Sequence, residues 1–330
     1  MKDILKLGSA DGKTNVTVIG TCLHPHALLQ DLLQLPGWEH HFYQAVIEFP
    51  KRTDLWKTYQ TLYSDLTDPN RGATALNFYH SNQALMDAGA KLLWPEADSL
   101  PKLYAMMVDE GEASFRSEKQ NEPYDPDRQW FAMKDAHYFE FVMEGTTTIG
   151  LRKAKQTYFL DRDFERVVAF HDPALAEKSG SDYGAIVVAA LDRYGHIYCL
   201  DAWVERQPIE RQIQQALWMH QKWGFKDLYL ETNNFQKLLQ TPYKLAREQA
   251  GITTLKVHSV DQHTNKLHRI STMQPDMVNG HLLFHRGLCP RFLEQLELFP
   301  TAKDDGPDAL HGAWSQLRKP RGHIQITPPR

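Results

Sequence analysis

The second half of the sequence predicts an α/β fold built on a mixed β-sheet. Two observations predict it: three apolar, β-branched runs follow one another through short links, and helical patterns then alternate with two further runs of that kind. Short links favour antiparallel neighbours, whereas a helix between two strands favours a parallel crossover. We therefore expect residues 160–320 to form three antiparallel strands followed by α/β crossovers, with helices flanking the sheet.

The first three strands are the most apolar part of the chain. They are RVVAFHD (166–172), AIVVAALD (185–192) and HIYCLDAWVE (196–205). Valine and isoleucine suit a pleated, buried surface. The first strand breaks its apolar run at its last residue, where Asp172 stands.

The crossovers follow in order. Helical spacing of Ile213, Ala216 and Leu217 predicts a helix that ends at Gly224. The later elements are a strand DLYLETN (227–233), a helix 235–251 interrupted near Pro242, a strand ITTLKVHSV (252–260), helical segments, a short strand LLFH (282–285) and a helix from about 306 to 317. This order, β-β-β-α-β-α-β and then helices, is that of a ribonuclease H-like sheet.

The first half is less regular. NVTVIGTCL (15–23) predicts a buried strand that ends in a turn at Gly20-Thr21, and HALLQDLLQL (26–35) predicts a short helix. Residues 51–159 contain helical pieces and the polar, proline-punctuated stretch 111–131, as expected of a linker or subdomain. We expect the domain boundary between about 140 and 163.

Composition excludes several classes of protein. The net charge of −4 argues against a basic coating protein, although it is compatible with a nucleic-acid enzyme that has an acidic metal site. No apolar run approaches the roughly 20 residues of a membrane span, and the N-terminus lacks signal-peptide character. The three cysteines match neither a zinc site nor a disulfide framework, which favours a reducing cytoplasm.

Three acids occupy positions that this fold would bring together. Asp172 ends the first strand, Glu231 ends the fourth, and Asp308 opens the last helix. The first and fourth strands of such a sheet are adjacent and parallel, and the last helix crosses their edge. Carboxylate oxygens are the ligands that Mg²⁺ and Mn²⁺ prefer, and two such ions stabilise the attacking and leaving oxygens of a phosphodiester displacement. We expect a two-metal site with these three residues as catalytic ligands.

The stretch DDGPDALHGA (304–313) has two explanations. Acids and a proline suit the first turn of a helix, so Asp304, Asp305 and Asp308 alone need no bound cation. Together with Asp172 and Glu231, they favour one wall of a metal site. Asp304, Asp305 and Asp182 are further candidates, either as ligands or as groups that support the ligands.

A resemblance to a known family rests on the quoted order of motifs. FHDPALAEKSGSDYGAIVV, GHIYCLDAW, YLETNNFQ, KLHRI, GHLLFH and LELFPTAKDDGPDALHGAW resemble the C-terminal nuclease domain of tailed-phage large terminase subunits, over residues 160–318. Upstream, ALNFYHSNQALMDAGAKLLWPEA and GEASFRSEKQNEP look like the segment that joins motor and nuclease, and residues 15–38 look like the end of the motor.

The resemblance implies a metal-dependent endonuclease that cuts double-stranded phage DNA during genome packaging, in the cytoplasm of a bacterial host and encoded by a phage or prophage. Asp172, Glu231 and Asp308 match its metal-ligand positions, and Asp182 matches an accessory acid. Lys266 and Arg269 match a basic pair that we assign to DNA phosphate. The partner that the resemblance implies is duplex DNA. Further candidate partners are a portal protein, a small terminase subunit or a separate ATPase chain.

The sequence departs from the family at its N-terminus, where residues 1–50 look like a remnant of a packaging ATPase. GSADGKT (8–14) has one residue too few between its glycines for a phosphate-binding loop and precedes a predicted strand instead of a helix. We therefore expect no ATP site and no ATPase activity.

Other polar residues have weaker assignments. Arg152, Lys153 and Lys155, before the nuclease sheet, are candidate DNA contacts, and so is the basic tail 321–330, which alternatively is a solvated or portal-docking segment. Histidines near the acids, namely His171, His263, His268 and His311, are candidate proton shuttles. Two rival functions stay open: another ribonuclease H-like nuclease, such as a Holliday-junction resolvase, or an inactive prophage module that binds DNA or the portal.

Overall fold

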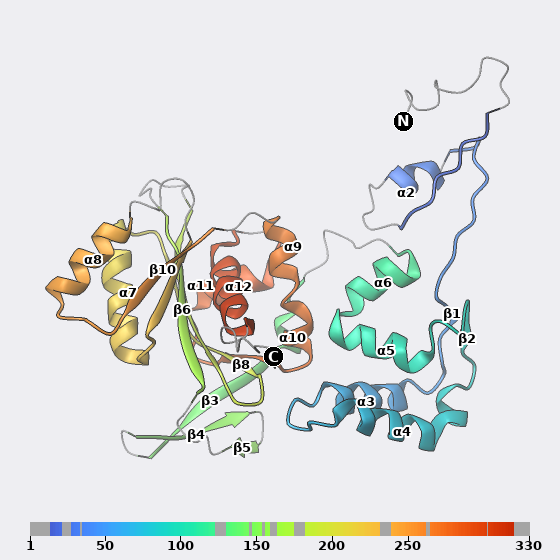
Figure 1. The fold of residues 1–330 in the computed structure, drawn as a ribbon, viewed down its shortest axis with the longest axis horizontal. Coiled ribbons are helices and arrows are strands. Elements are labelled where there is room, and N and C mark those ends of the chain that lie inside the picture. Colours follow the sequence, from blue (N-terminus) through green and yellow to red (C-terminus); the bar gives the residue numbers. More distant parts are fainter. Residues whose placement is uncertain are drawn as a thin grey trace, which may run out of the picture. The chain divides into compact units, whose positions relative to one another are not determined.

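The structure is a computed structural model, and it describes the chain in several ranges: 14–21, 28–33, 35–122, 130–144, 147–153, 156–158, 164–174, 182–231, 239–261, 265–301 and 303–319. Two compact units are present. One comprises Met1–Gln60 with Ala75–Asp125, and the other comprises Thr61–Thr74 with Pro126–Arg330. Figure 1 shows the elements of each unit.

The larger unit is built on a mixed sheet that has nine strands among the described residues. Their order is β10-β9-β6-β7-β8-β11-β3-β4-β5. The strands are β3 His137–Glu144, β4 Thr147–Lys153, β5 Gln156–Tyr158, β6 Arg166–Asp172, β7 Gly184–Leu191, β8 Ile197–Glu205, β9 Asp227–Glu231, β10 Lys256–Val260 and β11 Leu282–His285.

The ribonuclease H-like fold class predicted from the sequence is confirmed by the first five strands of this order. β6, β7 and β8 pair antiparallel, β9 pairs parallel with β6, and β10 pairs parallel with β9. The crossover helices are α7 Ile209–Trp223 and α8 Gln240–Gln249. Gly224, at φ 67°, ends α7 as its sequence position predicts.

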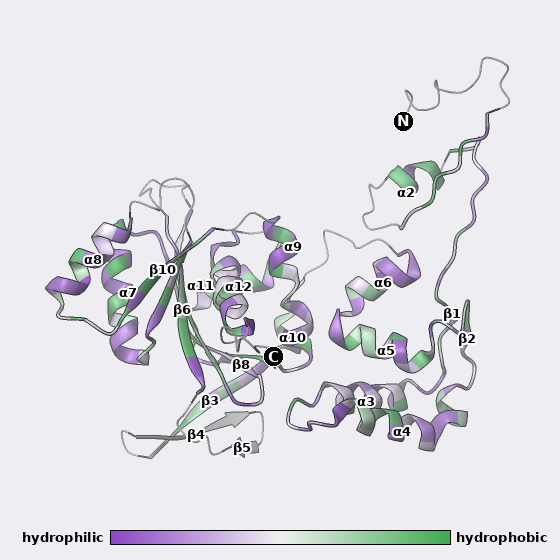
Figure 2. Cartoon of the chain, viewed as in Figure 1, coloured by the Kyte–Doolittle hydropathy of each residue, from purple (hydrophilic) through white to green (hydrophobic). Residues whose placement is uncertain are grey.

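Helices cover both faces of the sheet (Figure 1). α7 and α8 lie on one face, over a core that includes Ala169, Ile186 and Leu228. The other face packs against the remaining helices, which are α9 Lys266–Ser271, α10 Gln274–Val278, α11 Pro290–Glu297 and α12 Asp305–Arg318. In Figure 2 the central strands are coloured mainly as hydrophobic. Along α7 and α8, hydrophobic and hydrophilic colours alternate, as expected of amphipathic helices that pack on a sheet.

Three strands of this sheet were not predicted. β3, β4 and β5 lie between residues 137 and 158, in the segment expected to be linker, yet they extend the sheet beyond β11. Their sequence is less apolar than that of β6 to β8, and β3 reaches the sheet only through β11, which follows it by more than a hundred residues. The limits of the domains themselves stay a prediction.

The smaller unit is mainly helical. Its elements include α2 Leu28–Leu33, parts of α3 Thr53–Ser64 and α4 Arg71–Met86, α5 Leu100–Asp109, α6 Glu112–Gln120 and a short antiparallel pair of strands, β1 Val46–Glu48 and β2 Lys91–Leu92. Trp56 is buried at its centre, where its ring stacks on Tyr104 and its Nε1 donates to the Met86 carbonyl at 2.9 Å.

The predicted buried strand at 15–23 is wrong in the part that the structure describes. Thr14–Thr21 forms no strand, and Ile19 is 91% exposed. A β-branched run becomes a strand only when another strand satisfies its backbone, and the sheets among the described residues are built from other segments. The helix predicted next is confirmed as α2. Among the described residues, no helix is both long enough and apolar enough to cross a bilayer.

Candidate metal centre

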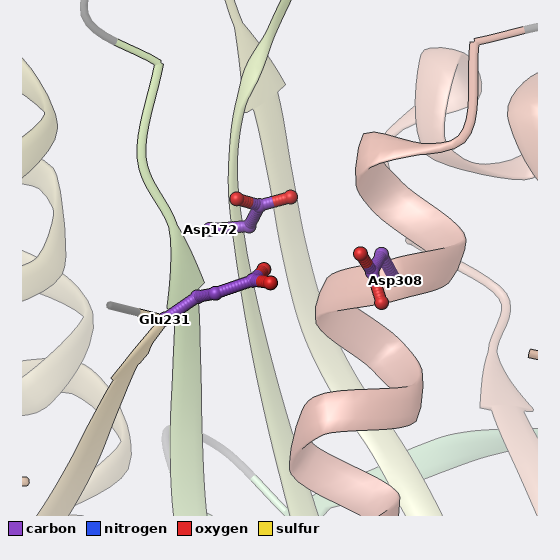
Figure 3. A group of neighbouring side chains, drawn as sticks. All are labelled: Asp172, Glu231 and Asp308. Carbon is purple, nitrogen blue, oxygen red and sulfur yellow. The ribbon is translucent and has the colours of Figure 1, made fainter. Parts of the chain in front are cut away.

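Asp172, Glu231 and Asp308 converge at one edge of the sheet. They come from the ends of β6 and β9 and from the first turn of α12, and Figure 3 shows their side chains pointing toward one another. One carboxylate oxygen from each lies within 4.8 Å of the others. Among the residues that the structure describes, this is the one group of acidic, histidine or cysteine side chains with the spacing of a metal site.

Strand periodicity aims the two strand acids at the same face. Val168 and Phe170 of β6 belong to the core beneath α12, so Asp172, two residues further, projects to that face. Leu230 of β9 pairs with His171 of β6, which places Glu231 next to Asp172. The predicted adjacency of the first and fourth strands is therefore present, and it sets the acids side by side.

Close helix packing brings in the third acid. α12 runs over β6 and β7, and Gly312 sits directly on the Phe170 ring. A Cβ at position 312 would lie 2.4 Å from that ring, so only glycine allows this approach. Asp308, one turn earlier in the helix, is thereby held over the end of β6.

Asp308 is buried and paired with both predicted basic residues. It is 2% exposed, its Oδ1 accepts a hydrogen bond from Arg269 at 2.6 Å, and its Oδ2 lies 3.2 Å from Lys266 Nζ. Lys266 also contacts Asp304 at 2.8 Å. The pair from α9 thus lies within the acid cluster, and its proposed contact with DNA phosphate stays a prediction.

Repulsion and burial raise the pKa values of the two strand acids. The pKa of Asp172 lies well above its ordinary value because of burial and then because of the Glu231 and Asp308 carboxylates. Burial and Asp308 likewise raise the pKa of Glu231. Burial alone would lower the pKa of Lys266, but Asp308, Asp304 and Asp172 outweigh it and raise that pKa. The site therefore has more negative charge than its own cations balance.

The accessory acids lie beside the cluster, and neither joins it. Asp182 is exposed and pairs with Lys303, and Asp305 is buried with its Oδ2 lacking a hydrogen-bond partner among the described residues. The Asp305 carboxylate accepts the backbone N–H of Tyr183, although burial is the larger influence and raises its pKa. Asp182 and Asp305 are thus not among the acids whose carboxylate oxygens lie within 4.8 Å of one another. A ligand role for either residue stays a prediction.

Of the four histidines near the motifs, His171 lies on the wrong face for a proton shuttle. It is fully buried beneath α7 and α8, where its Nδ1 pairs with the Tyr243 hydroxyl at 2.7 Å and its Nε2 with Gln212 Oε1 at 3.0 Å. Burial lowers its pKa to about 4. His171 is therefore a neutral scaffold residue, because alternation along β6 sends it away from Asp172.

The other histidines differ in exposure. His311 is buried on α12 with Nδ1 lacking a partner among the described residues, and burial together with Arg269 lowers its pKa to about 4. His268 is exposed on α9. His263 lies outside the described residues.

The remaining basic candidates cannot be placed as side chains. Arg152 and Lys153 belong to β4, of which the structure describes the backbone path. Lys155, the tail 321–330 and nearly all of GSADGKT lie outside the described residues.

Sequence reasoning missed Gln212, which supports the strand end that carries Asp172. Gln212 is fully buried, and its Nε2 donates to the carbonyls of Ala174 at 2.8 Å and Gln207 at 2.7 Å. A polar residue next to Ile213, on the apolar stripe of α7, was the available signal. Buried side-chain amides of this kind fix local backbone geometry.

Comparisons with known proteins find distant structural likenesses alone. No family model and no curated protein sequence matches this chain. The nuclease domain of the large terminase subunit gp2 of bacterial virus Sf6 aligns over 47% of this chain and 89% of its own, at 10% identity and a TM-score of 0.33. A mutant of that domain with manganese and β-thujaplicinol gives the same values.

A second kind of protein is also similar. T. thermophilus RuvC in complex with a Holliday junction substrate aligns over 45% of this chain and 91% of its own, at 14% identity and a TM-score of 0.26. At such scores the likenesses carry no argument about chemistry. The fold is assigned from strand order and register, and the site from its own geometry.

Proposed function

We propose that this chain is a divalent-metal-dependent nuclease that hydrolyses phosphodiester bonds in double-stranded DNA. The observation that carries the proposal is the convergence of three carboxylates, from two parallel strand ends and one helix start, within 4.8 Å of one another. A ribonuclease H-like sheet places these acids at one edge, and their ligand chemistry suits Mg²⁺ or Mn²⁺.

The residues present fit a bound cation. All three donors are carboxylates, and Glu231 Oε2 is buried with no hydrogen-bond partner among the described residues. Lys266 interacts with five carboxylates, those of Asp172, Glu231, Asp304, Asp305 and Asp308, and Arg269 is the second cation near them. Excess buried negative charge of this kind requires protons or metal ions for balance.

Divalent ions at this site would activate water and stabilise the leaving oxygen of a phosphodiester displacement. The chain's own residues prepare the site for that chemistry. Asp172, Glu231 and Asp308 would hold these ions. Lys266 and Arg269 orient Asp308 and supply positive charge where a DNA phosphate would arrive.

The finer proposal is that the chain acts on phage DNA during packaging, as a terminase-type nuclease encoded by a phage or prophage and working in the bacterial cytoplasm. The order of motifs from residue 160 to 318 supports it. Two Mg²⁺ or Mn²⁺ ions and duplex DNA are its proposed ligands. A portal protein, a small terminase subunit or a separate ATPase chain are the proposed partners.

The test is cleavage of supercoiled plasmid by the purified full chain in Mg²⁺, Mn²⁺ or EDTA, with Asp172→Asn as the matched variant. We expect nicked and linear products in metal and none in EDTA or with the variant. A folded protein that cuts in neither metal would overturn the proposal. Cleavage of four-way junctions or RNA–DNA hybrids in strong preference to linear duplex would instead support a resolvase or ribonuclease H.

A further inference from the structure

A cluster of basic and aromatic side chains lies at the same end of the sheet as the acid cluster, and its two arginines have no part in the site described so far. Its centre is Tyr183, just before β7. The guanidinium carbon of Arg206 lies 4.0 Å from the centre of the Tyr183 ring, and that of Arg291 lies 5.2 Å from it. Arginine planes stack on aromatic rings in this way, and the contact pre-orients the guanidinium.

Strand register places Tyr183 and Arg206 at the same end of the sheet as the acids. Asp172 pairs with Ala185, and Gly184 pairs with Glu205. One further step along the ladder brings Tyr183 opposite Arg206, which agrees with their contact. The four neighbouring strands β9, β6, β7 and β8 therefore each place one of these residues at this edge, in the order Glu231, Asp172, Tyr183 and Arg206.

Alternation places them on the same face as well. Ala185 and Val187 of β7 and Ala202 and Val204 of β8 belong to the core beneath α12, and Tyr183 packs against that core. Arg206 therefore continues the face that carries Asp172.

The helices of that face hold the cluster in place. The Tyr183 N–H donates to the carboxylate of Asp305, in the same helical turn as Asp308. Arg291, at the start of α11, is held by the Val204 carbonyl at 3.0 Å and by Glu205 at 2.8 Å. Tyr183, on whose ring Arg206 stacks, is thus hydrogen-bonded to α12, the helix that carries the proposed metal ligand Asp308.

Arg206 is exposed at this edge of the sheet. Two further basic side chains lie near it, and each pairs with a carboxylate: Arg291 with Glu205 and Lys303 with Asp182. A phosphate next to the metal site can therefore approach the Arg206 guanidinium from solvent.

We propose that Arg206, stacked on Tyr183 and braced by Arg291, binds a backbone phosphate of the DNA strand that crosses the acid cluster. The inference rests on the proposed function, because it defines the path of that strand from β6 over β7 to β8. Two strand spacings separate β6 from β8, about 10 Å, or the axial rise of roughly three nucleotides. Arg206 would then fix the substrate on one side of the scissile bond without reading sequence.

The test is binding of a fluorescein-labelled DNA duplex by anisotropy in EDTA, over a series of NaCl concentrations. The wild-type full chain is compared with Arg206→Gln. Loss of one phosphate contact should lower the slope of log affinity against log salt by about one and weaken binding about 5- to 30-fold at low salt. The control is Arg211→Gln, an exposed arginine on α7, which covers the opposite face of the sheet.

Two further variants test whether the Tyr183 ring positions Arg206 for DNA binding or whether positive charge alone is enough. Tyr183→Phe keeps the ring and should bind DNA as the wild type does, whereas Tyr183→Leu should weaken binding and lower the slope part of the way. Equal slopes for wild type and Arg206→Gln, equal losses in the Arg206 and Arg211 variants, or no duplex binding by the wild type would each overturn the inference.

The readout also separates this inference from the nuclease proposal, because binding in EDTA requires no cutting. An Arg206-dependent slope in a chain that never cuts plasmid would refute the nuclease and support the phosphate contact. Asp172-dependent cutting with unchanged binding by Arg206→Gln would support the nuclease and refute the phosphate contact.

Discussion

Removing one carboxylate of the cluster should stabilise the metal-free protein, although it destroys the proposed site. Asp172→Asn keeps the size of the side chain and removes its charge. Two unit charges 4.8 Å apart repel by about 3.5 kcal/mol at an effective dielectric constant of 20, and Asp172 has two such neighbours. Lys266 offsets part of this repulsion, and protonation relieves more. We therefore expect the free energy of unfolding to rise by about 1–3 kcal/mol in EDTA at pH 8.

The pH dependence follows from the raised pKa of Asp172. The folded wild type takes up a proton more readily than its unfolded chain does. The stability that this proton confers is complete below the ordinary aspartate pKa of about 3.9 and is lost as the pH rises through the raised pKa. The advantage of Asp172→Asn should therefore be largest at pH 8 and should shrink toward pH 4.

Divalent metal should narrow or reverse the difference. The wild type gains about 2.7 kcal/mol when Mg²⁺ is at 100 times its dissociation constant, whereas the variant has lost a ligand and gains less. Thermal unfolding followed by calorimetry measures both effects, since 1 kcal/mol corresponds to about 2–4 °C for a unit of this size. Glu210→Gln, an exposed acid on α7, is the control. An Asp172→Asn variant that is less stable than the wild type by the same amount in EDTA and in Mg²⁺ would refute the reasoning.

Three further predictions concern the framework of the site. Arg269→Met leaves a buried Asp308 carboxylate with one partner fewer and should cost about 3–5 kcal/mol in EDTA, measured by urea unfolding. The loss should be much smaller in an Asp308→Asn background, and equal losses in both backgrounds would contradict the pairing. Gly312→Ala should destabilise by about 1–3 kcal/mol despite better helix propensity, because its Cβ meets the Phe170 ring, and a melting temperature at or above that of the wild type would refute this packing. Gln212→Leu removes hydrogen bonds from three partners, the buried His171 ring and the carbonyls of Ala174 and Gln207, and should cost about 1–3 kcal/mol in thermal unfolding. An unchanged melting temperature would show that the amide supports nothing.

Local pattern was enough to predict the centre of the sheet and the meeting of its acids. The runs that became β6, β7 and β8 are apolar and β-branched, and their short links leave antiparallel pairing as the simplest arrangement. In the ribonuclease H-like order that these elements indicate, the crossover through α7 leads to β9 beside β6, which sets Asp172 beside Glu231. Their meeting is observed, while their role as metal ligands stays a prediction.

Long-range and side-chain features could not be predicted in this way. β3, to which β4 and β5 are added in turn, pairs with a strand far along the chain, and no local pattern marks that partner. Asp305 and Asp308 share one helical turn, yet the backbone of Tyr183 engages one while Lys266 and Arg269 engage the other. Which of these two acids joins the cluster therefore depends on tertiary contacts that the local sequence does not predict.

The most direct test of the central claim is a calorimetric titration of Mn²⁺ into the wild-type chain and into Asp172→Asn, Glu231→Gln and Asp308→Asn, with Glu210→Gln as the control. The account predicts saturable binding by the wild type and the control, and binding weakened at least about tenfold by each of the three cluster variants. Equal affinity in all five proteins, or no binding by the wild type, would contradict the claim that these three carboxylates form one metal site.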